Sequence, residues 1–174
     1  YAFPLVWMAV SGLKTNQQIF RDPFALPETW DFSIWLEAWQ VGNIGQYALN
    51  SAITTSATVV VILLCASGAA FAFSRFDFKG KAILMGVLSL GLLLPLQSYF
   101  IAQSAMFNAL YITNTRFALI IPYIAMGLPL ATYLLTVYLR ALPDELFEAA
   151  RMEGASDFTM YRLIAMPLLK PGIA

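Results

Sequence analysis

Charged residues divide the chain into long apolar runs that are separated by short polar links. No charged side chain occurs between Glu37 and Arg75, between Lys81 and Arg116, or between Arg116 and Arg140. Each interval has room for the ~20 apolar residues that cross the hydrocarbon core of a bilayer as a helix. We therefore predict an all-α polytopic membrane protein. The predicted spanning helices cover residues 47–73, 83–106 and 117–139.

The two ends of the chain and the distribution of lysine and arginine complete the predicted topology. Residues 1–13 are apolar but too short to cross, and they lack the basic start of a signal peptide, so we interpret them as the end of a span that begins upstream. Of the ten basic residues, seven lie in segments 74–81 and 140–171, and three lie in segments 14–46 and 107–116. Because cytoplasmic loops are the more basic ones, segment 140–171 is predicted to be cytoplasmic and segment 14–46 extracytoplasmic.

Composition excludes several classes of function. Hydrophobic residues make up 60% of the chain and charged residues only 11%, and the net charge is zero with no basic cluster, which excludes a nucleic-acid binder. There is no histidine, and the single cysteine, Cys65, lies in an apolar run, so no metal site, disulfide or catalytic pair is expected. The chain also lacks a phosphate-binding GxxxxGK[ST] loop and an acidic relay inside its spans. We expect no cofactor and no enzymatic activity, and an energy source outside this chain.

The second predicted span contains polar residues next to a proline. Pro95 removes a backbone donor, and Gln97, Tyr99 and Gln103 follow it. Broken backbone and polar groups at membrane depth are tolerated only against protein or a water-lined cavity. These three residues either line a path for a polar solute or belong to a kink that is buried between helices.

Segment 140–171 is predicted to form a helical hairpin. Pro143 suits the first turn of a helix, Gly154 can take the left-handed conformation that ends it, and Ser156 can cap a second helix that runs toward Pro167. From Arg140 to Asp157 there are two basic and five acidic residues. Helices that lie on a bilayer are usually basic, so the acidic charge favours a hairpin that enters a groove of a partner protein.

The residues of this hairpin resemble a known motif. Glu148-Ala149-Ala150, followed by Gly154 and then by Ile164 and Pro167, closely resembles the EAA loop of the membrane subunits of ATP-binding-cassette importers. Glu153 and Met166 depart mildly from that pattern, which commonly has aspartate and leucine at these positions. Four further stretches resemble the carbohydrate-uptake branch, which contains the maltose and glycerol-phosphate permeases: NSA at 50–52, SRFDFKGK at 74–81, Asn114-Thr115 and GLPLATYLL.

The resemblance implies a permease subunit of a bacterial importer in the cell (inner) membrane. Such a subunit works with a dimer of cytoplasmic ATP-binding subunits, a second permease subunit and an extracytoplasmic solute-binding protein. Its loop forms a coupling helix that docks on the ATPase, and the family usually has six spans, two of them after this loop. Carried over to this chain, the coupling residues are Glu148, Ala149, Ala150, Met152, Gly154 and Ala155.

Two other interpretations of the sequence remain open. The first keeps the importer but changes the solute to a peptide, an amino acid or an inorganic anion. The second is a membrane scaffold or sensor that only recruits a cytoplasmic partner. Proline-broken spans with polar residues favour a solute path over a scaffold.

Overall fold

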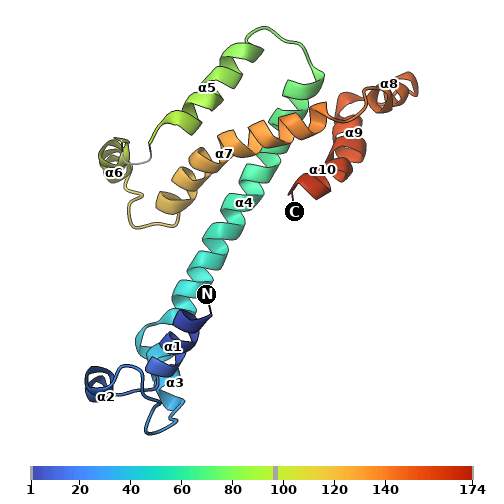
Figure 1. Cartoon of the computed structure of the whole chain (residues 1–174). Helices are drawn as coiled ribbons and strands as arrows, with labels where there is room; N and C mark the ends of the chain where they lie inside the picture. Colours follow the sequence, from blue (N-terminus) through green and yellow to red (C-terminus); the bar gives the residue numbers. More distant parts are fainter. Residues whose placement is uncertain (1, 96–97, 174) are drawn as a thin grey trace. The chain divides into compact units, whose positions relative to one another are not determined.

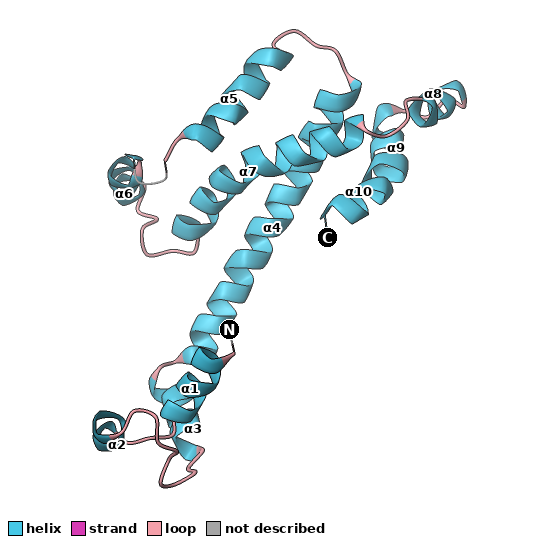
Figure 2. Cartoon of the chain, viewed as in Figure 1, coloured by secondary structure: helices cyan, strands magenta, loops and turns pink. Residues whose placement is uncertain are grey.

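The computed structural model describes residues 2–95 and 98–173, and the chain divides into two units, Tyr1–Ala52 and Ile53–Ala174. The described residues form helices and connecting loops, without a strand (Figure 2). This agrees with the predicted all-α fold. Each unit is described separately below.

The first unit contains α1 (Phe3–Ser11), α2 (Asn16–Arg21), α3 (Ser33–Val41) and the first turns of α4 (Ile44–Arg75). A capping box starts α2, because the Thr15 hydroxyl accepts from the Gln18 backbone and the Gln18 side chain accepts from the Thr15 N–H. The Pro23 carbonyl accepts hydrogen bonds from Lys14 Nζ at 2.9 Å and from Trp7 Nε1 at 3.0 Å. The predicted extracytoplasmic segment 14–46 therefore has helices of its own. Its three tryptophans, Trp30, Trp35 and Trp39, are each more than half exposed.

Two helices of the structure are long and apolar enough to cross a membrane, among the described residues. They are α4 and α7 (Phe117–Arg140), which match the helices predicted over residues 47–73 and 117–139 to within three residues at each end. Both end in an arginine, Arg75 and Arg140. The helical hairpin that follows α7 packs against these two helix ends.

The single helix predicted over residues 83–106 is wrong, because the structure has two helices there. They are α5 (Lys81–Leu93) and α6 (Phe100–Ala109). Leu94, the residue before Pro95, has extended backbone with φ −73° and ψ 124°, which is the conformation that a following proline ring favours. With 13 residues, α5 is about 20 Å long and falls short of the ~30 Å hydrocarbon core by itself. Gln97 lies outside the described residues.

In the second unit, α7 packs against α5 and crosses α4 (Figure 1). A Cβ atom on Gly127 of α7 would lie 2.6 Å from the Ile62 Cδ1 atom of α4, so glycine permits this approach. A Cβ atom on Gly91 of α5 would lie 3.0 Å from the Pro129 ring of α7. Small residues at such contacts let helices approach within a membrane.

The chain after α7 forms α8 (Glu145–Met152), α9 (Asp157–Met160), a π-helical turn η2 (Tyr161–Ala165) and α10 (Met166–Ile173). The second helix of the hairpin is predicted to run toward Pro167, and helical structure continues past this residue to Ile173. Within η2 the Met166 N–H bonds back to the Tyr161 carbonyl, five residues earlier. The α-helical register restarts at Met166, so Pro167 lies in the first turn of α10, where its missing N–H breaks no intrahelical bond.

Candidate functional site

The turn between α8 and α9 has the geometry that the sequence predicts. Gly154 has φ +84°, a left-handed conformation. Its N–H donates to the Arg151 carbonyl, and the Ala155 N–H donates to the Ala150 carbonyl, each at 3.0 Å. This pair of bonds is a Schellman motif, which satisfies the last carbonyls of a helix. Ser156 then caps α9 by accepting from the Thr159 N–H at 3.2 Å, which confirms the predicted cap.

The six predicted coupling residues divide into two groups in the structure. Ala150 and Ala155 are half-buried and pack against the hydrophobic core of the second unit. Glu148, Ala149 and Gly154 are exposed, and Met152 is 89% exposed. Of the six residues, Ala150 and Ala155 are the two that pack against this core. The exposed group is available to a partner.

The inner face of α8 is held by one aromatic residue. Phe147 is only 4% exposed, and its ring lies 6.2 Å from that of Phe71 on α4. The Phe71 ring also lies 5.6 Å from that of Tyr161, whose hydroxyl is 2.8 Å from Ser67 Oγ of α4. The buried core around these rings joins α4, α7, α8 and the C-terminal helices. Burial of a phenylalanine side chain is worth roughly 1.5–3 kcal/mol, so Phe147 attaches α8 to this core.

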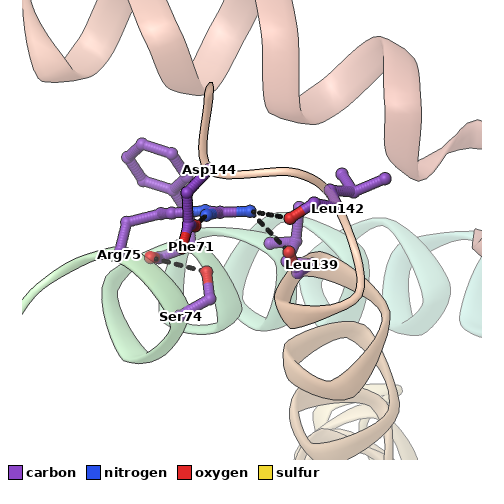
Figure 3. Close-up of polar contacts among 6 residues, drawn as sticks. All are labelled: Phe71, Ser74, Arg75, Leu139, Leu142 and Asp144. Carbon is purple, nitrogen blue, oxygen red and sulfur yellow. Dashed lines mark hydrogen bonds and ion pairs between the residues drawn. The ribbon is translucent and has the colours of Figure 1, made fainter. Parts of the chain in front are cut away.

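Arg75, the last residue of α4, contacts three successive segments of the chain (Figure 3). Its Nη2 donates to the Leu139 carbonyl at 2.6 Å and to the Leu142 carbonyl at 3.4 Å. Its Nη1 forms an ion pair with Asp144, the residue that precedes α8. The guanidinium carbon also lies 3.9 Å from the centre of the Phe147 ring, within the range of a cation–π interaction.

The sequence did not reveal the importance of Arg75 and Phe147. Arg75 counted there only as one of the basic residues that set the orientation of the chain. Its partners are 64 to 72 residues away in sequence, beyond the reach of any local pattern. The available signal was the position of a lone arginine directly at the end of an apolar run, where it can reach carbonyls at the end of a neighbouring helix.

A second candidate site is a cavity of about 600 Å³ lined by residues of α5, α6 and α7. Tyr99 and Gln103, two of the three residues predicted for a solute path, lie in its wall and are half-buried. Pro122 lines the wall contributed by α7, and Gly91 and Leu92 line the wall contributed by α5. The structure therefore brings Tyr99 and Gln103 to one concave surface, which is otherwise mostly apolar.

These features define a class of protein: an all-α polytopic membrane protein that presents a short, acidic helical hairpin beyond the ends of its long apolar helices. A family comparison makes this class specific. Residues 66–174 match the family described as binding-protein-dependent transport system inner membrane component, and the chain belongs to this family. The matched residues include the end of α4, the whole of α7 and the hairpin.

Three members of this family are similar in sequence to the chain over almost its whole length. The diacetylchitobiose uptake system permease protein NgcG of Streptomyces coelicolor is 33% identical over 98% of this chain and 57% of its own length. The probable ABC transporter permease protein YurM of Bacillus subtilis is 34% identical over 98% of this chain and 56% of its own length. The multiple sugar-binding transport system permease protein MsmG of Streptococcus mutans is 32% identical over 97% of this chain and 61% of its own length. The chain thus spans about three fifths of the length of these relatives.

Proposed function

We propose that this chain is part of the permease subunit of an ATP-driven importer for carbohydrates in a bacterial inner membrane. In this proposal the subunit forms part of the solute path and hydrolyses nothing itself. A pair of cytoplasmic ATPase subunits supplies the energy through the α8–α9 hairpin. A second permease subunit and an extracytoplasmic solute-binding protein complete the importer.

The hairpin carries this proposal. Its inner face is fixed by the buried Phe147 ring, while Glu148, Ala149 and Met152 are exposed on α8. Small and apolar side chains beside carboxylates are suited to entering a groove on another protein. The exposed Ala149 side chain leaves room for the close approach of such a partner.

The choice of carbohydrate as the solute rests on the relatives. Their names assign diacetylchitobiose to NgcG and multiple sugars to MsmG. Pockets for small molecules are mostly apolar and carry a few precisely placed polar groups that fix the orientation of the ligand. We propose that Tyr99 and Gln103 offer such polar groups in the cavity between α5, α6 and α7.

Reconstitution of the full-length permease with its partner subunits tests the function. We expect ATP-dependent uptake of an oligosaccharide into proteoliposomes, and ATPase activity that rises when the loaded solute-binding protein is added. Ala149→Trp places a large ring on the exposed face of α8, where it meets the partner and not the core of this chain. Uptake and the stimulation of ATPase activity should both be lost in this variant.

Ala82→Trp is the matched control. Ala82 is also an exposed alanine on a helix, and it follows segment 74–81, which is basic like segment 140–171. Tryptophan is well tolerated at a membrane interface, so uptake should be retained. Full activity of Ala149→Trp would refute docking through α8. High-affinity binding of an amino acid by the solute-binding partner would refute the assignment to carbohydrates, and absence of any solute flux would favour a scaffold.

A further inference from the structure

At the cytoplasmic-side ends of α4 and α7, each helix donates a hydrogen bond from an arginine side chain to a backbone carbonyl of the other helix. Arg75 of α4 donates to the Leu139 carbonyl near the end of α7, and Arg140 of α7 donates at 3.4 Å to the Phe73 carbonyl near the end of α4. The last carbonyls of a helix have no intrahelical partner and carry partial negative charge, so a guanidinium from the neighbouring helix satisfies both needs. We call these two arginines and the carbonyls that they contact the arginine junction.

Arg75 extends the junction to the hairpin, whereas no interaction described for Arg140 does so. The Arg75 side chain is only 8% exposed, and it contacts the start of the hairpin at two points, the carboxylate of Asp144 just before α8 and the Phe147 ring on α8. One buried guanidinium at the end of α4 therefore contacts both α7 and α8. A displacement of α8 relative to α4 must break or carry along these contacts.

We propose that Arg75 is a positioning residue that transmits displacement of α8 to the ends of α4 and α7. The proposal rests on the function proposed above, because α8 is there the helix that meets the ATPase. Without Arg75, α8 can still bind its partner through its exposed face. Its movement would then be absorbed by the link over residues 141–144 instead of reaching the long helices.

The geometry also says which substitutions matter. Lysine has a single ammonium group, which cannot reproduce a planar fork that bonds carbonyls through one nitrogen and a carboxylate through the other. The carboxylate of Asp144 is 80% exposed, and ion pairs with exposed groups contribute little. The carbonyl contacts and the Phe147 ring therefore carry most of the transmission, and Asp144 carries little.

The test uses the full-length permease in proteoliposomes with its ATPase and solute-binding partners. The measured quantity is the amount of solute transported per ATP hydrolysed, for complexes whose assembly is verified by co-purification of the ATPase. Arg75→Gln should lower this ratio roughly tenfold, which is within the usual range of coupling between sites. Arg75→Lys should also lower it, whereas Asp144→Asn and Arg140→Gln should each leave it within about twofold.

Lys81→Met is the matched control. Lys81 also pairs with an aspartate, Asp77, and donates to a carbonyl, that of Phe76, but it makes these contacts within its own link. The Lys81→Met variant should transport as much solute per ATP hydrolysed as the unmodified protein. A normal ratio in assembled Arg75→Gln complexes overturns the inference. So does failure of both Arg75 variants to assemble, since Arg75 would then serve assembly alone. An unmodified complex without ATP-dependent uptake would instead overturn the proposed function.

Discussion

Gly154 allows a quantitative test of what the hairpin turn requires. A Cβ atom added at this position meets no other atom within 4 Å, so no steric clash inside the chain opposes a side chain. The φ of +84° is the whole constraint. A non-glycine residue in left-handed backbone costs roughly 1–2 kcal/mol, with asparagine at the low end and β-branched residues above the range.

A second effect acts in the opposite direction and changes the expected net cost. Replacing glycine by alanine restricts the unfolded segment and by itself stabilises by about 0.4–1 kcal/mol. For Gly154→Ala the net destabilisation of the turn is therefore about 0–1.6 kcal/mol, with a centre of about 0.8 kcal/mol, which is the strain less the restriction. Gly154→Asn should be close to neutral, and Gly154→Val should cost about 2 kcal/mol or more, a factor of roughly 30 in the population of the formed hairpin.

Hydrogen exchange of the full-length permease measures this series directly. The amides of residues 154 and 155 are the two donors of the Schellman motif, so their protection reports its opening. Exchange should accelerate in the order asparagine, alanine, valine, and solute transported per ATP should fall in the same order. Gly68→Ala is the control, because Gly68 lies inside α4 and an added Cβ atom there also meets open space. Equal exchange in the valine and asparagine variants would refute the assignment of the constraint to backbone conformation.

Two further predictions concern the packing of the second unit. Phe147→Ala should weaken the packing of α8 on the core by about 3–5 kcal/mol, because it empties a buried site shared with Phe71 and Arg75. Limited proteolysis between residues 141 and 156 should then become rapid. Unchanged resistance to the protease would contradict the packing described. Gly127→Leu should reduce the yield of folded protein, because its side chain would overlap Ile62. Ile62→Ala should restore that yield in the double variant, and failure of this rescue would show that the glycine is needed for another reason.

The sequence predicted those parts of the fold that depend on local chemistry. An uninterrupted apolar run located α7, and a glycine followed by a serine located the turn at Gly154 and the cap at Ser156. Pro95 was seen as a disruption, but periodicity alone could not show that the chain leaves the helix one residue earlier. The different surroundings of Ala149 and Ala150 were also out of reach, since neighbouring residues of a helix face different directions and only the packed structure shows which one meets the core.

The π-helical turn before α10 has a consequence for the direction in which the hairpin faces. Met160 and Leu169 are both completely or almost completely buried in the same core. Nine residues of regular α-helix, at about 100° each, would place them on opposite sides of the axis. A turn that accommodates one extra residue reduces their separation to about 80°, so both can face the same neighbours. Deleting a single residue between Tyr161 and Ala165 would therefore restore a regular α-helix and keep this angle at about 80°, so α8 and α9 would keep their direction relative to α10.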